Sequence, residues 1–132
     1  MRSLWDNHPP TTAILPAPID YVPEPTTVLQ PDVVVVERHE AAQRRLTRVP
    51  LLVVEVLSAS TRRQDLGSKR LAYAGHGVPV YWVVDPEPPV SLTVLHLRGD
   101  GYVEVARVTG DDAYRASVPF DVTIVPARLA DL

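Results

Sequence analysis

At 132 residues the chain is long enough for one domain with its own hydrophobic core and too short for two. Hydrophobic residues make up 45% of it and charged residues 22%, a composition that excludes an intrinsically disordered chain. The net charge is −3 at pH 7, so the chain as a whole exerts no general electrostatic attraction on nucleic acid.

Several features of the sequence indicate a compartment. The chain has no cysteine, so it has neither a disulfide framework nor a thiolate metal site. Its apolar runs are far shorter than the roughly 20 residues that a membrane-spanning helix needs. The first six residues become polar too early for a signal peptide. We therefore expect a cytoplasmic protein with no membrane association.

The first third of the chain predicts strands separated by irregular segments. Residues 1–13 contain Pro9-Pro10 and no apolar period, which indicates an irregular lead-in. Residues 14–22 are extended, and their prolines favour an edge or irregular strand, followed by a loop over residues 23–31. The run Asp32-Val33-Val34-Val35-Val36 is typical of a strand that is buried on both faces.

The middle of the chain predicts a second buried strand and one helix. Residues 37–50 are polar, with a helical turn expected near residues 41–45, and residues 51–57 form the strongest strand pattern. Thr61 and Gln64 fit a capping box, so the helix is expected to begin there. It should end near Gly75 and Gly77, which can adopt a left-handed cap conformation.

The last third of the chain predicts further strands. Residues 78–85 form a third apolar strand, and residues 92–97 and 102–108 flank an Asp-Gly pair that is typical of a hairpin. A short strand at residues 122–125 and a stub of helix at residues 127–132 complete the pattern. The order of elements favours a mixed sheet with a helix against one face, an α/β or α+β architecture, in a single domain over residues 1–132.

Two acidic residues stand in these apolar strands. Asp32 begins one strand and Glu55 lies inside another, where an unpaired carboxylate is costly to bury. Strand alternation places Glu55 on the same face as Val53 and Leu51. Two carboxylates that converge at one end of a sheet suit a hard divalent ion such as Mg²⁺. The backbone carbonyl of Val56 is a candidate third ligand.

A purely structural role of each acid stays open. Asp32 follows Pro31, and it could simply begin a strand. Glu55 could pair with an arginine.

Lys69 is the only lysine among 13 basic residues, and it lies on the predicted helix that follows the Glu55 strand. A lysine near a metal-bound water can stabilise the charge that develops on a phosphate, or help to deprotonate the water. Asp65, four residues earlier on the same helical face, could orient the ammonium group. The alternative is an exposed Asp65–Lys69 surface pair.

An ordered series of motifs resembles a known family. The series is Pro31-Asp32-Val33-Val34-Val35, Val53-Val54-Glu55-Val56-Leu57-Ser58, Thr61 to Tyr73 with Lys69, and Gly77-Val78 with Tyr81-Trp82-Val83-Val84-Asp85-Pro86. It is similar to the Uma-two-type putative restriction endonucleases of the PD-(D/E)XK nuclease superfamily.

The resemblance implies a restriction-endonuclease-like core in which Asp32 and Glu55 match the two acidic half-motifs. The superfamily usually places its lysine two residues after the second acid, where this chain has Leu57, and Lys69 on the following helix matches the position that this family uses. Family members carry an N-terminal helix that packs on the sheet. Because residues 1–13 predict no helix, the core is expected to lack it. Three explanations stay open: a fragment, a chain with a misplaced start or a degenerate copy.

These observations lead to three functional hypotheses. The first is an endonuclease that hydrolyses DNA phosphodiester bonds with Mg²⁺, or with Mn²⁺, at Asp32, Glu55 and Lys69, and that contacts the DNA backbone through Arg62 and Arg63. The second is a catalytically inactive or truncated nuclease-like domain that binds nucleic acid or a protein partner. The third is a structural protein that forms a homodimer by covering an exposed sheet face.

Overall fold

A six-stranded mixed sheet forms the centre of the protein in the computed structural model, which describes residues 2–58 and 66–131. In spatial order its strands are β1 (Thr12–Pro16), β4 (Val33–Glu37), β6 (Leu52–Val56), β7 (Val80–Asp85), β8 (Ser91–Arg98) and β9 (Gly101–Thr109). β6 and β7 are parallel, and every other neighbouring pair in this sheet is antiparallel.

The predicted buried strands occupy the middle of the sheet. β4 and β6 consist almost entirely of Val and Leu, whose branched side chains pack well on a pleated surface that is covered on both faces. Val34 and Val53 on one face, and Val35 and Trp82 on the other, have no exposed surface. Trp82 is therefore a core residue.

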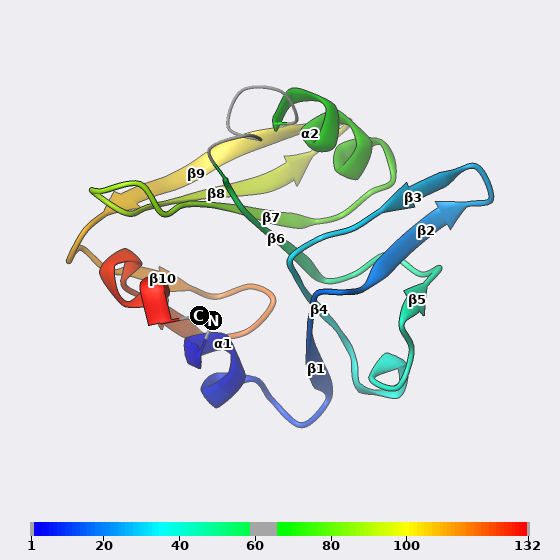
Figure 1. Ribbon diagram of the computed structural model, residues 1–132, viewed down its shortest axis with the longest axis horizontal. Coiled ribbons are helices and arrows are strands. Elements are labelled where there is room, and N and C mark those ends of the chain that lie inside the picture. Colours follow the sequence, from blue (N-terminus) through cyan, green and yellow to red (C-terminus); the bar gives the residue numbers. More distant parts are fainter. Residues whose placement is uncertain (1, 59–65, 132) are drawn as a thin grey trace.

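One face of the sheet is covered by α2 (Leu66–Gly75) and by a small sheet of β3 (Thr27–Leu29), β2 (Asp20–Glu24) and β5 (Arg45–Leu46) (Figure 1). Tyr73 from α2 packs there against Tyr81, and Tyr81 against Tyr102, with ring centroids 5.2 and 5.6 Å apart. These aromatic contacts join α2 to β7 and β9, and they belong to the hydrophobic cluster that contains Val34 and Val53.

The opposite face carries the chain ends. Here lie α1 (Arg2–Asn7), the pair β10 (Tyr114–Ala116) and β11 (Val122–Ile124), and the 3₁₀-helix η2 (Pro126–Asp131) (Figure 1). Their apolar side chains form a second cluster around Trp82. The mixed sheet with few helices confirms the predicted α+β class. None of the described helices combines the length and the apolar character needed to cross a membrane.

The irregular lead-in predicted for residues 1–13 is wrong. Arg2–Asn7 form α1, whose Leu4 is fully buried in the cluster around Trp82, and β1 already begins at Thr12. The expectation of a core without an N-terminal helix is corrected by the same observation. Six residues gave no visible apolar period, but a single buried leucine is enough to dock so short a helix.

The edge or irregular strand predicted over residues 14–22 is two strands in two sheets. β1 pairs with β4, whereas β2 pairs with β3 and β5. Pro16 and Pro18 explain the break, because a proline offers no N–H to continue a ladder. The loop predicted over residues 23–31 contains β3, which turns back along β2 with Glu24 opposite Thr27.

Two helical predictions are shifted. The turn expected near residues 41–45 is a 3₁₀ turn, η1 (Arg38–Glu40), and the stub expected at residues 127–132 is η2. Thr61 and Gln64, the predicted capping box, lie outside the described residues. The predicted glycine cap is confirmed at Gly77, which has φ +80°, while the amide of Val78 donates to the Tyr73 carbonyl at 3.0 Å.

The predicted hairpin is confirmed, with a different turn. Arg98 pairs with Gly101, so Gly99 and Asp100 form the two-residue connection between β8 and β9. Gly99 has φ +65°, as the first position of a type II′ turn requires, and the predicted Asp-Gly pair is offset by one residue.

Candidate active site

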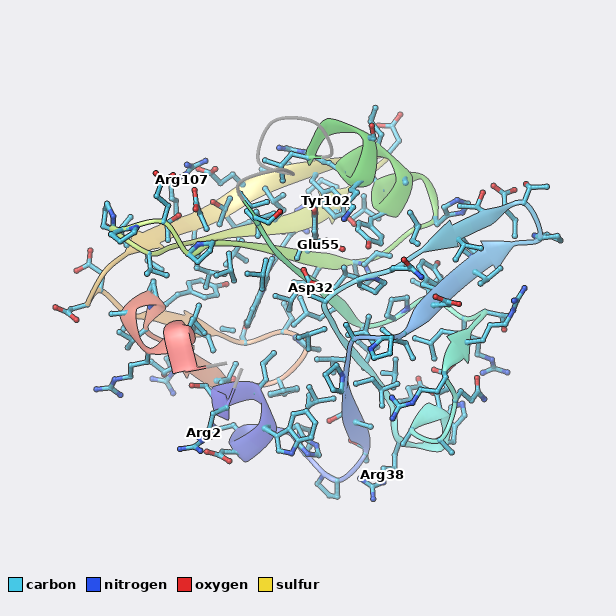
Figure 2. The ribbon with its side chains drawn as sticks, viewed as in Figure 1. Arg2, Asp32, Arg38, Glu55, Tyr102 and Arg107 are labelled. Atoms are coloured by element: carbon cyan, nitrogen blue, oxygen red, sulfur yellow. The ribbon has the colours of Figure 1, made fainter. Side chains whose placement is uncertain are left out.

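Asp32 and Glu55 meet because β4 and β6 run antiparallel. Val33 lies opposite Val54, so the next pair along the ladder brings Asp32 beside Glu55 and Val56. The backbone N–H of Val56 donates to Oδ2 of Asp32 at 2.6 Å. Both side chains lie near the middle of the molecule (Figure 2). The predicted convergence of two carboxylates at one end of the sheet is therefore what the structure has.

Glu55 is only 4% exposed, and two donors from α2 satisfy its carboxylate. The hydroxyl of Tyr73 donates to Oε1 at 2.7 Å, and Nζ of Lys69 donates to Oε2 at 3.0 Å. Lys69 and Tyr73 are one helical turn apart, so both reach the same acid from one face of α2. Glu55 is paired with a lysine, and the alternative of an arginine partner does not occur within residues 2–58 and 66–131.

Burial raises the pKa of the Glu55 carboxyl above its ordinary value. The hydrogen bonds from Tyr73 and Lys69 and the positive charge of Lys69 oppose this rise, and the negative charge of Asp32 adds to it. The pKa of the Tyr73 hydroxyl is also raised, by burial first and then by the adjacent Glu55 charge. Tyr73 therefore stays a neutral donor to a carboxylate whose charge is costly to bury.

The acids and the lysine line one pocket of about 210 Å³. Val56, Leu57 and Ser58 at the end of β6 contribute to its wall, as do Gln30, Leu66 and Tyr81. The Lys69 side chain stays 32% exposed while its ammonium group is paired with Glu55. The arrangement places one cation and two anions around a small polar hollow.

The residues present fit a divalent metal ion. Each carboxylate oxygen has two lone pairs, so Glu55 keeps acceptor capacity after binding Lys69 and Tyr73. Asp32 and Glu55 match the one or two carboxylates by which Mg²⁺ is commonly held, with waters and phosphate oxygens as the other ligands. No third His, Cys, Asp or Glu joins them in the described part of the chain. Val56, predicted as a carbonyl ligand, lines the pocket, and its N–H holds Asp32.

Some predicted site residues cannot be placed. Arg62, Arg63 and Asp65 lie outside the described residues, so the predicted DNA contacts and the Asp65–Lys69 pair are not addressed by the structure. Leu51 was predicted to share the face of Glu55. It precedes β6 and packs against the cluster around Trp82, on the opposite face of the sheet.

Sequence reasoning did not assign Tyr73 to the site. Its spacing of four residues from Lys69 was the available signal, since positions i and i+4 share one face of a helix. Gln30 was also missed. It lies inside the loop predicted over residues 23–31, and nothing in its immediate sequence marks it as part of a pocket.

Comparison with solved structures gives a similar fold. The crystal structure of a putative nuclease belonging to DUF820 from Anabaena variabilis matches with a TM-score of 0.61 at 14% sequence identity, over 83% of this chain and 61% of that chain. The present chain thus spans about 61% of the length of that protein. At this identity the likeness concerns the fold alone.

Comparison with curated proteins gives no match. A protein-family model does match, over residues 5–126, which include both acids, α2 and all strands from β1 to β11. The model is that of Uma2, described as putative restriction endonuclease. The chain therefore belongs to the Uma2 family of putative restriction endonucleases.

Proposed function

We propose that this domain is a metal-dependent endonuclease that hydrolyses DNA phosphodiester bonds, with Mg²⁺ as its cofactor and Mn²⁺ as a substitute. The observation that supports it best is the meeting of Asp32, Glu55 and Lys69 around one pocket of about 210 Å³. Membership of a family described as putative restriction endonuclease supports the same reaction class.

Each residue of the proposed site would have its own role. Asp32 and Glu55 would hold the metal, which supplies a Lewis acid and lowers the pKa of bound water. The Val56 N–H fixes the orientation of Asp32, and Tyr73 fixes that of Glu55. Lys69, whose side chain is partly exposed, would donate to an oxygen of the scissile phosphate and stabilise its developing charge.

DNA is the proposed partner, and Arg62 and Arg63 are the proposed contacts to its backbone. In the chain they follow Ser58, which lines the pocket, and precede Leu66, where α2 begins. Arginine binds phosphate oxygens through two parallel N–H groups, which suits this role. Their replacement by glutamine should weaken DNA binding and reduce its salt dependence.

Nicking of supercoiled plasmid DNA tests the proposal. The wild-type protein should nick the plasmid in Mg²⁺ or Mn²⁺ and not in EDTA, and Asp32→Ala or Glu55→Ala should abolish nicking. Asp100→Ala, in the exposed β8–β9 turn, is a matched control that should leave activity unchanged. Metal-dependent nicking that survives both Asp32→Ala and Glu55→Ala would show that the active site lies elsewhere.

A second candidate is a catalytically inactive module that binds nucleic acid or a protein. The ion pair between Lys69 and Glu55 favours it, because it satisfies the buried acid without a metal. The net charge of −3 also favours it over a general DNA-binding surface. Calorimetry with Mg²⁺ or Mn²⁺ separates the two, since an inactive module should show no metal binding that depends on Asp32 and Glu55.

A further inference from the structure

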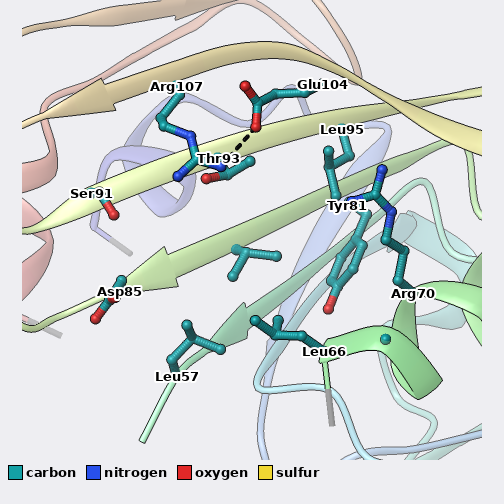
Figure 3. Close-up of a pocket in the computed structure, with 12 residues that line it drawn as sticks. Leu57, Leu66, Arg70, Tyr81, Asp85, Ser91, Thr93, Leu95, Glu104 and Arg107 are labelled. Atoms are coloured by element: carbon teal, nitrogen blue, oxygen red, sulfur yellow. Dashed lines mark hydrogen bonds and ion pairs between the residues drawn. The ribbon is translucent and has the colours of Figure 1, made fainter. Parts of the chain in front are cut away.

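A second pocket, of about 360 Å³, adjoins the candidate active site. Leu57, Leu66 and Tyr81 line both pockets, so the two share a wall. The second pocket extends from there across β7, β8 and β9 on the side of the sheet that α2 covers (Figure 3). A ligand bound in it would be an immediate neighbour of a phosphate bound beside Asp32 and Glu55.

The lining of this pocket is amphipathic. Val83 and Leu95 form an apolar floor together with the two shared leucines, and Ser91 and Thr93 bring hydroxyl groups to it. Apolar walls with a few convergent polar groups are typical of sites for small organic molecules. The volume also lies in the range of such sites, roughly 300–1,000 Å³.

The charges around the pocket balance. Arg70 and Arg107 are matched by Asp85 and Glu104. Nη2 of Arg107 lies 2.8 Å from Oε1 of Glu104 (Figure 3). Nη2 of Arg70 donates to the backbone carbonyl of Tyr102 at 3.1 Å. A site with no excess of positive charge favours a neutral ligand over a phosphate.

Tyr81 lines both pockets, and its hydroxyl is an available hydrogen-bond donor. Its side chain is fully buried, and its hydroxyl has no hydrogen-bond partner among the residues that the structure describes. In Figure 3 the hydroxyl is directed toward Leu66, at the shared wall. Burial and the nearby Glu55 charge raise the pKa of Tyr81, so it keeps its proton. A buried donor without a partner is costly, and a ligand at the junction would satisfy it.

We propose that the second pocket accepts an unpaired nucleobase of the DNA strand whose phosphate is bound beside Asp32 and Glu55, and that Tyr81 donates a hydrogen bond to that nucleotide. A nucleobase is neutral, flat and edged with polar atoms, as the amphipathic lining requires. This inference rests on the proposed nuclease function. A base stacked and paired in a duplex cannot enter a pocket, so the preferred substrate has a single-stranded or flipped-out nucleotide at the cleavage position.

Oligonucleotide binding tests the pocket separately from cleavage. The Glu55→Gln protein in EDTA is titrated with a short single-stranded DNA carrying one 2-aminopurine, and fluorescence polarisation gives the affinity. Thr93→Phe fills the pocket from β8, and Thr123→Phe makes the same change at an exposed position on β11 as a control. Tyr81→Phe removes only the unpartnered hydroxyl.

Thr93→Phe should weaken binding of the single strand about tenfold, the order of losing one base contact, and should abolish the change in 2-aminopurine fluorescence. Tyr81→Phe should weaken binding about fivefold, as for one hydrogen bond, while Thr123→Phe should have no effect. The matching duplex should bind more weakly than the single strand. Unchanged binding in Thr93→Phe, or a preference for the duplex, would overturn the inference.

The outcomes also separate this inference from the nuclease proposal. If the wild-type protein nicks plasmid in Mg²⁺ but Thr93→Phe binds the single strand normally, the base pocket is wrong and the nuclease stands. If single-stranded binding depends on Thr93 and Tyr81 but no nicking occurs in any metal, the pocket stands and the nuclease proposal is wrong.

Discussion

Lys69 and Tyr73, one turn apart on α2, bind opposite oxygens of the same buried carboxylate. Nζ of Lys69 lies 3.0 Å from Oε2 of Glu55, and the hydroxyl of Tyr73 lies 2.7 Å from Oε1. The helix therefore fixes both the position and the charge environment of the acid on β6. Substitution of Tyr73 therefore tests the stability of the domain, and substitution of Lys69 tests the chemistry of its site.

Tyr73→Phe should destabilise the domain by about 1.5–3 kcal/mol at pH 7, because it removes a hydrogen bond to a buried charged group. Tyr102→Phe is a matched control. Its hydroxyl is also buried and also makes a 2.7 Å bond, but to the neutral carbonyl of Val78, so its loss should cost only about 1 kcal/mol. Urea unfolding measures both. Equal losses in the two variants would mean that Glu55 is not charged in the folded protein.

Lys69→Gln should lower the rate of plasmid nicking by about 100-fold while the domain stays folded. The amide can still donate a hydrogen bond to Oε2 of Glu55, but it carries no charge to stabilise the phosphate. The folded state is checked by circular dichroism. Arg98→Gln removes one positive charge from an exposed position at the end of β8 and should not affect nicking. A similar loss in both variants would indicate a general electrostatic effect.

Asp32→Asn should lower the affinity for Mn²⁺ by about tenfold or more, since the affinity of such sites depends on the number of charged ligands. The amide oxygen can still accept the hydrogen bond from the Val56 N–H, so the unfolding free energy should change little. Calorimetry gives the affinity. Wild-type Mn²⁺ affinity in this variant would remove Asp32 from the metal site.

The raised pKa of Glu55 predicts that the contribution of this residue to the stability of the metal-free domain is larger at mildly acidic pH. The folded protein takes up a proton on Glu55 at a higher pH than the unfolded chain, whose ordinary value is 4.5. In the window above 4.5 the folded state therefore binds more protons, and this contribution to stability falls as the pH rises through the folded pKa.

The measurement is the unfolding free energy of wild-type protein minus that of Glu55→Gln, followed in EDTA from pH 4 upward. Because the glutamine side chain that replaces Glu55 does not titrate, the contributions of all other groups cancel to first order. The difference should decrease with rising pH and then become constant. A difference that grows with pH would mean that Lys69 and Tyr73 outweigh burial and lower the pKa.

The sequence alone determined the elements whose residues repeat a simple pattern. Val33–Val36 and Leu52–Val54 are runs typical of strands buried on both faces, and an unpaired acid beside or inside such a run is costly to bury. Asp32 and Glu55 were singled out on that ground, and Lys69 was singled out as the only lysine of the chain, on the predicted helix that follows the Glu55 strand. The glycine cap of α2 at Gly77 was equally local, because it depends on backbone conformation at one residue.

The pairing of the elements and the side chains that share a pocket depend on tertiary contacts. Residues 14–22 form strands of two different sheets, and α1 is held by the burial of Leu4 against elements from the other end of the chain. Likewise, the role of Tyr73 depends on α2 crossing over β6, and the second pocket depends on the order of β7, β8 and β9. Local propensity acts over a few residues, whereas register and docking are fixed by contacts between residues far apart in sequence, which no single segment encodes.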